Sequence, residues 1–165
     1  MKHLATAAGR LLMVSMSFLP AIVDAQVRIN EVSYSTSNDE IELKNFGTSP
    51  VDVSSWWFCS LFSYTPLSTM TIISGSQNIP PGGIVAFSGM NLNNASADLG
   101  LYNSNSFAST SAMEAFVQWG SSGQGRESVA VGKGIWTSGD FIPTGGPGSS
   151  IAYDGSGDSS SDWGD

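Results

Sequence analysis

Two groups of carboxylates in this sequence have spacings that could do chemistry. Glu40 and Glu42 lie two residues apart, so on a β-strand they share a face, as a pair of carboxylates in general acid–base catalysis would. Asp154, Asp158 and Asp162 follow one another in a segment rich in Gly and Ser, where flexible oxygen ligands suit a hard cation such as Ca²⁺. The spacing does not fit an EF-hand loop. Each group also has a plainer interpretation, a solvated strand face for the first and a solvated loop for the second.

Aromatic side chains form a third candidate group, and most of them belong to the predicted core. Trp56, Phe58 and Trp119 fall on the inward phase of their strands, where aromatic rings bury the most area. Trp57 has the opposite phase. We therefore expect Trp57 to be the best candidate for an exposed aromatic side chain that binds a ligand, unless the Asn-rich loop at residues 88–99 covers it.

Histidine and cysteine are too scarce for several kinds of site. The only histidine is His3 and the only cysteine is Cys59. If the first 25 residues are removed as a signal peptide, His3 is lost with them. No histidine then remains for Ser-His-Asp or Cys-His catalysis or for a zinc site. A single cysteine allows no intramolecular disulfide. We expect Cys59 to be a buried, inert thiol rather than a reactive thiol or an intermolecular crosslink.

The first 25 residues have the features of a secretory signal peptide. Lys2 and Arg10 give a basic start, residues 11–19 form a short apolar run, and small residues precede a cleavage point after Ala25. A buried N-terminal helix is the alternative. The sequence therefore predicts a signal peptide (1–25) and one domain (26–165) that is secreted, periplasmic or at the cell surface. No later apolar run is long enough for a transmembrane helix.

The charge balance disfavours polyanionic partners. The formal net charge of the whole chain is −8, and removal of the predicted signal peptide takes away two cations but only one acid, Asp24. Such a surface repels phosphate backbones and anionic membranes, so we expect no nucleic-acid partner. It favours solubility and, in principle, divalent cations.

The segment Asp39–Phe58 is predicted to form a hairpin around which the fold is organised. Ile41 and Leu43 alternate with charged residues, which is the pattern of a half-buried strand. A turn rich in Gly and Pro follows, and a second alternating strand begins at Val51. The phase shift at Ser54-Ser55 is interpreted as a β-bulge.

The rest of the chain is predicted to add short strands separated by turns. These strands are expected at Gln26–Tyr34, Cys59–Tyr64, Leu67–Ile73, Ile84–Phe87, Glu114–Trp119 and Ser150–Tyr153. Residues 88–99 are interpreted as a long loop, with Leu99–Tyr102 as an apolar island in it. Arg126–Val131 fits either a strand or one helical turn, and the C-terminal tail looks loop-like. The pattern predicts an all-β antiparallel sandwich of about seven to nine strands.

Several motifs in order resemble the lamin tail domain, in particular its exported bacterial members. They are I-N-E-V at Ile29–Val32, E-I-E-L-K-N at Glu40–Asn45, V-D-V-S-S-W at Val51–Trp56, P-P-G-G at Pro80–Gly83, and the stretch Met113–Gly139. The resemblance implies an immunoglobulin-like β-sandwich and a docking or surface-tethering role, with no catalytic motif. DNA binding, known for the lamin domain, relies on a basic surface that this acidic chain lacks.

We therefore expect a non-catalytic interaction module that binds a protein or a cell-surface polymer. Trp57, Glu40 and Glu42 are its candidate binding residues. The first alternative is an extracellular domain stabilised by Ca²⁺, held by Asp154, Asp158 and Asp162 or by the Asn-rich loop. A hydrolase with paired carboxylates is the second alternative.

Overall fold

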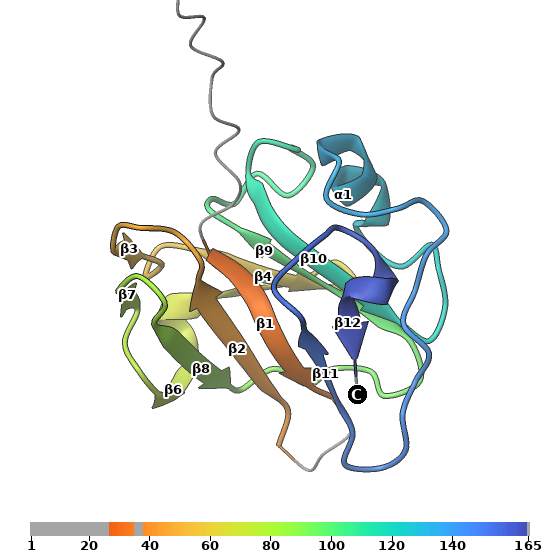
Figure 1. Cartoon of the computed structure of the whole chain (residues 1–165), viewed down its shortest axis with the longest axis horizontal. Helices are drawn as coiled ribbons and strands as arrows, with labels where there is room; N and C mark the ends of the chain where they lie inside the picture. The colour runs from red at the N-terminus through yellow and green to blue at the C-terminus, as the bar shows by residue number, and fades with distance from the viewer. Residues whose placement is uncertain (1–26, 35–37, 165) are drawn as a thin grey trace, which may run out of the picture.

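The structure, a computed structural model, describes residues 27–34 and 38–164, and its described part is an antiparallel β-sandwich (Figure 1). The predicted signal peptide lies outside these residues. The first sheet has six strands in the order β12 (Trp163–Gly164), β11 (Ser150–Tyr153), β1 (Val27–Ser33), β2 (Glu40–Asn45), β8 (Ile84–Ser88), β6 (Thr71–Ser74). The second sheet has four strands in the order β10 (Met113–Trp119), β9 (Ala97–Tyr102), β4 (Trp57–Ser60), β5 (Ser63–Pro66). A separate pair consists of β3 (Val51–Asp52) and β7 (Asn78–Ile79).

The all-β sandwich expected from the sequence is confirmed. Of the twelve strands in the described part, β3, β7 and β12 have only two residues each. The remaining nine strands lie at the upper end of the predicted range of about seven to nine. Figure 1 shows the six-stranded sheet in front of the four-stranded one, with helix α1 (Glu127–Lys133) beside β10. No helix in the described residues is long and apolar enough to cross a membrane.

The core lies between the two sheets and is built by alternating side chains. On the first sheet, Ile29, Ile41 and Phe87 point inward and are almost completely buried. On the second sheet they meet Phe58, whose ring lies edge-on to Phe87 at a centroid distance of 6.1 Å. Trp119 is also fully buried, as predicted, whereas Trp56 is half-buried at the margin of the core.

The predicted Asp39–Phe58 hairpin is wrong. Strand β2 pairs with β1 and β8 rather than with β3, and β4 belongs to the opposite sheet. The phase shift at Ser54-Ser55 is a turn that takes the chain from one sheet to the other, closed by a bond from the Trp56 N–H to the Val53 carbonyl at 3.0 Å. A crossing and a bulge shift the phase in the same way, so the sequence pattern alone does not separate them.

Asn45 fixes the start of this crossing. Its side chain is fully buried, and its Nδ2 donates to the carbonyls of Ser49 at 2.8 Å and Ile79 at 2.9 Å. Its Oδ1 accepts from the Gly47 N–H at 2.8 Å. One amide thus satisfies three backbone groups of the turn and of the β3–β7 pair.

The apolar island Leu99–Tyr102 is part of a central strand, not of a loop. All six residues of β9 are buried, and β9 lies between β10 and β4. Gly100, which weakened the strand pattern, is required by close packing, because a Cβ there would lie 2.8 Å from Cε2 of Tyr102. Packing between two neighbouring strands overrides the weak local signal.

Three other segments differ from or refine the expectation. The predicted strand Leu67–Ile73 is a short 3₁₀ helix, η1 (Leu67–Thr69), followed by β6 on the other sheet. The ambiguous segment after Arg126 is helical, and α1 ends at Gly134 in the left-handed conformation with φ 83°. The tail forms η2 (Ser160–Asp162) and β12 rather than a plain loop.

Candidate functional site

The turn between β4 and β5 has an unusual backbone. Its two central residues, Leu61 and Phe62, have φ angles of 48° and 65°, and they are the only non-glycine residues with positive φ in the described part. Tight hairpin turns of this kind normally use Asn or Gly, because large side chains in this region cost about 1–3 kcal/mol each. Leu61 is nevertheless 39 % exposed and Phe62 55 % exposed. Such strain at a protruding apolar tip marks it as a candidate functional feature.

A buried carboxylate anchors this turn. Asp98 on β9 is completely buried, and its Oδ1 accepts from the Leu61 N–H at 2.7 Å. Its Oδ2 accepts from the Arg126 N–H at 2.9 Å. Gly125 passes so close that a Cβ there would lie 2.4 Å from both carboxylate oxygens. Asp98 therefore ties the turn to the segment that precedes α1.

Burial and hydrogen bonding shift the pKa of the Asp98 carboxyl in opposite directions. Burial raises the pKa above its ordinary value, because the charged form loses water. The hydrogen bonds from Arg126 and Leu61 lower it, and burial is the larger effect. Burial thus makes ionisation of Asp98 less favourable than it is in water.

Arg126 completes a stack of rings on this surface. Its guanidinium carbon lies 4.9 Å from the ring centroid of Phe62 and 5.7 Å from that of Tyr64. The Tyr64 ring stacks in turn on Phe107 at a centroid distance of 3.9 Å, and Nη2 of Arg126 donates to the Tyr64 hydroxyl. We call Leu61, Phe62, Tyr64 and Arg126 the hairpin-tip surface.

Arg126 forms no ion pair among the residues that the structure describes. Arg28 and Lys133, in contrast, pair with Asp158 at 3.0 Å and Glu114 at 3.7 Å. The Nε of Arg126 is buried and has no hydrogen-bond partner within the described chain, as is also true of the Tyr102 hydroxyl. The guanidinium therefore lies among the Phe62 and Tyr64 rings, the Tyr64 hydroxyl and the Cys59 thiol, without a direct ion pair to a carboxylate.

Cys59 lies behind this surface and is buried, as predicted. Its cross-strand neighbours are Tyr64 on β5 and Gly100 on β9. Burial, assisted by the negative charge of Asp98, raises the pKa of the thiol to about 11. The thiolate that would react is thus scarce at neutral pH.

We expect Cys59 to resist thiol reagents in the folded protein. At pH 8, a chromogenic disulfide reagent should label it at least a hundredfold more slowly than in 6 M guanidinium chloride, because the thiol is both protonated and covered. The rate of colour formation measures this. A native-state rate near that of the unfolded chain would contradict the burial described here.

Trp57, the sequence candidate for an exposed aromatic, is half-buried on the same outer face as Tyr64. Phe107 packs edge-on against it at a centroid distance of 5.7 Å, and its cross-strand neighbours are Pro66 and Tyr102. The loop that contains Phe107 packs against it, rather than the Asn-rich loop that the sequence suggested. Trp57 contacts the ring on which Tyr64 stacks, so it lies beside the hairpin-tip surface rather than forming it.

Glu40 and Glu42 lie on the outer face of the other sheet. Strand pairing places Glu42 opposite Glu31, a third carboxylate that sequence reasoning did not associate with them. Oε1 of Glu42 accepts from Nδ2 of Asn30 at 2.5 Å, and the acids line a shallow hollow of about 80 Å³. The structure therefore keeps this acidic group apart from the hairpin-tip surface.

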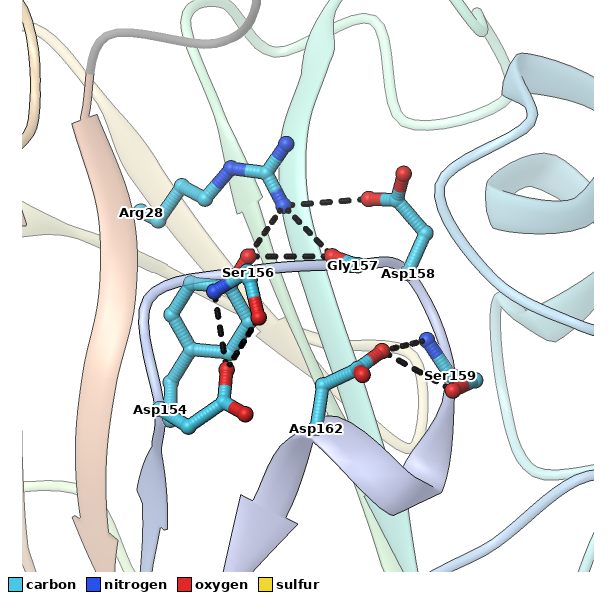
Figure 2. A network of polar contacts seen from close by, with 8 residues as sticks. Arg28, Asp154, Ser156, Gly157, Asp158, Ser159 and Asp162 are labelled. Carbon is cyan, nitrogen blue, oxygen red and sulfur yellow. Dashed lines mark hydrogen bonds and ion pairs between the residues drawn. The ribbon is translucent and has the colours of Figure 1, made fainter.

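The three tail aspartates each serve a different local interaction (Figure 2). Oδ1 of Asp154 accepts from the N–H and hydroxyl of Ser156, at 2.8 and 3.0 Å. Oδ2 of Asp162 accepts from the N–H and hydroxyl of Ser159, both at 2.8 Å, and forms a capping box. Asp158 forms the ion pair described above.

Arg28 organises this tail from strand β1. Its Nη1 donates to the Gly157 carbonyl at 3.2 Å and to the Tyr153 hydroxyl at 3.1 Å, in addition to Asp158 (Figure 2). Within residues 27–34 and 38–164, no three His, Cys, Asp or Glu side chains are grouped so that they could hold a metal ion. Binding of Ca²⁺ stays a prediction.

Sequence reasoning missed the residues of the hairpin-tip surface and its anchor. Leu61 and Phe62 carry no turn signature, and Arg126 lay in a segment of ambiguous structure. Asp98 offered one usable signal, a single acid inside the apolar run Ala97–Tyr102. A buried acid at such a position needs polar partners, which points to a structural or functional role.

No known family model matches this chain, and no curated protein or solved structure shows significant similarity to it.

Proposed function

We propose that this protein is an exported, non-catalytic module that binds a carbohydrate polymer of the cell surface through the hairpin-tip surface. The observation that carries the proposal is the strained turn at Leu61 and Phe62, which holds a large apolar side chain in solvent beside an arginine without an ion pair. The predicted signal peptide supports the location outside the cytoplasm. The resemblance to the lamin tail domain supports a docking role.

The size and composition of the surface favour a polysaccharide over a protein partner. A stable protein interface usually buries about 800 Å² on each side and involves 20–30 residues. The exposed apolar part here comes from three side chains, Leu61, Phe62 and Tyr64. The exposed ring of Phe62, with the apolar Leu61 beside it, matches the apolar C–H face of one sugar ring.

The chemistry of the surface supports binding rather than catalysis. The carboxylate that anchors the surface, Asp98, is buried, and each of its oxygens accepts a backbone N–H. The thiol of Cys59, behind the surface, is covered and protonated at neutral pH. An aromatic and cationic surface without an available base or nucleophile is suited to holding a ligand.

Affinity electrophoresis of the purified protein through gels that contain soluble polysaccharides tests this proposal. At least one polymer should retard the protein, and Phe62→Ser should weaken the retardation about tenfold, because the ring supplies much of the apolar contact. Phe46→Ser is the matched control. Phe46 is also exposed, at 37 %, and has a cation over its ring, Lys44 at 4.8 Å, but it lies outside the hairpin-tip surface.

Two results would contradict the proposed function. One is that no polysaccharide retards the wild-type protein. The other is that Phe46→Ser and Phe62→Ser weaken the retardation equally, since the aromatic contact would then not lie at the hairpin tip.

A further inference from the structure

We propose that Arg126 makes the hairpin-tip surface selective for carboxylated sugars, so that the ligand is a polysaccharide containing uronic acid. This inference rests on the proposed function and names its ligand class. It follows from the position of the guanidinium, from its charge environment and from the number of cations at the surface.

The rings of Phe62 and Tyr64, the Tyr64 hydroxyl and the Cys59 thiol surround part of the guanidinium of Arg126. The rings of Phe62 and Tyr64 lie against it at 4.9 and 5.7 Å from the guanidinium carbon to the ring centroids. One Nη2 hydrogen is directed to the Tyr64 hydroxyl, and Nε is buried. The remaining N–H groups are those of the terminal nitrogens, which form the planar fork that matches a carboxylate.

The charge environment leaves Arg126 available for an anion from outside. It forms no ion pair within the described chain, although acids outnumber Lys and Arg by fourteen to six in the whole sequence. The buried carboxylate Asp98 interacts electrostatically with Arg126 and accepts its backbone N–H, but it forms no ion pair with the guanidinium. A carboxylate on the ligand would supply the direct ion-pair partner that the described chain does not provide.

A single cation fits one carboxylate better than a chain of phosphates. Polymers with a charge at every backbone unit are bound by several Lys or Arg side chains along a groove. Within the described residues the hairpin-tip surface contributes only Arg126, and the net charge of −8 repels dense polyanions. A uronic acid offers one planar carboxylate on a ring whose C–H face can lie on the exposed Phe62 ring.

Matched ligands and matched variants test this inference. Isothermal titration should compare otherwise neutral oligosaccharides that carry a single galacturonic, glucuronic or mannuronic acid residue with their carboxyl-reduced counterparts, and with a peptide that ends in a free carboxylate. The variants are Arg126→Gln, Arg126→Lys and the control Lys44→Gln. Lys44→Gln removes the same charge from a cation that also lies over a ring, but on the other sheet. Thermal melts verify that each variant is folded.

We expect at least one uronate oligosaccharide to bind about tenfold or more tightly than its carboxyl-reduced counterpart. Arg126→Gln should remove this preference while leaving residual binding of the neutral sugar. Arg126→Lys should restore part of it, because the charge returns without the fork. Lys44→Gln should leave it unchanged.

The failure of this inference differs from the failure of the proposed function. Suppose that neutral and carboxylated sugars bind equally, that Phe62→Ser weakens the binding of both, and that Arg126→Gln weakens the binding of neither. The proposal of a polysaccharide-binding module then stands, and the proposed selectivity for carboxylated sugars is wrong. If no sugar binds, both are wrong. If only the peptide binds, and it binds through Arg126, the ligand is the C-terminus of a protein. Both the proposed polysaccharide binding and the proposed selectivity for uronic acid are then wrong.

Discussion

Replacing Asp98 with alanine should lower the free energy of unfolding by about 2–5 kcal/mol. The substitution leaves the part-buried N–H groups of Leu61 and Arg126 without their acceptor, and each unsatisfied buried group costs about 1–3 kcal/mol. It also releases the strained turn from its anchor. Urea denaturation followed by tryptophan fluorescence measures the effect.

Asp52→Ala is the control for this prediction. Asp52 also accepts a backbone N–H, that of Ser54 at 2.9 Å, but the bond is local and exposed, so we expect a loss below about 1 kcal/mol. If Asp98→Ala costs no more than Asp52→Ala, the carboxylate does not anchor the turn. Asp98→Ala should also weaken polysaccharide binding, because Leu61 and Phe62 would no longer be held at the tip.

The pH dependence of stability should carry the signature of the raised pKa of Asp98. A carboxyl whose pKa is higher in the folded than in the unfolded state contributes stability that is complete below the unfolded pKa, near 3.8, and is lost as the pH rises through the folded pKa. The difference in melting temperature between wild type and Asp98→Asn should therefore favour the wild type most at acidic pH and diminish toward neutrality. A difference that grows toward neutral pH would mean that the hydrogen bonds, not burial, dominate the pKa.

Trp119→Ala should be the most destabilising single substitution on β10, with a loss of about 3–5 kcal/mol. The side chain is completely buried and stacks on Tyr34 at a centroid distance of 4.7 Å and an interplanar angle of 18°. Its Nε1 also donates to the Asn93 carbonyl at 2.9 Å, so the substitution removes both the packing and a bond to the Asn-rich loop. Denaturation with guanidinium chloride measures the change.

Two further variants separate the causes of this loss. Trp119→Phe keeps most of the ring contact with Tyr34 and removes the hydrogen bond, so we expect a smaller loss of about 1–2 kcal/mol. Trp163→Ala, at a half-buried position on the two-residue strand β12, should cost less than Trp119→Ala. Equal losses for Trp163 and Trp119 would contradict the central position of Trp119.

The strands were predictable where one face is buried and the other solvated. In β2 the alternation of Ile41 and Leu43 with charged residues leaves a clear signal, and the structure confirms that both are buried. Strand β9 was missed because both of its faces are covered, which removes the alternation, and because Gly100 and Asp98 are poor strand formers. The crossing at Ser54-Ser55 was missed because sheet membership depends on contacts between distant segments.

The hairpin-tip surface could not be predicted from the sequence for a related reason. Its residues come from positions 61–64 and 126, and the link between them is a carboxylate at position 98. Local rules favour Asn or Gly at the turn, and they give no reason to place Leu61 and Phe62 there. The stabilising contacts that permit this turn exist only in the folded chain.

The order of strands in the first sheet has a consequence for the time course of folding. Strand β1, near the start of the described chain, lies between β2 and β11, and its register pairs Glu31 with Ala152. Arg28 on the same strand bonds with residues 153, 157 and 158. Contacts across such sequence separations form late and slow the folding of β proteins. A nascent chain therefore stays incomplete along one edge of β1 until residues 150–153 of β11 have been synthesised.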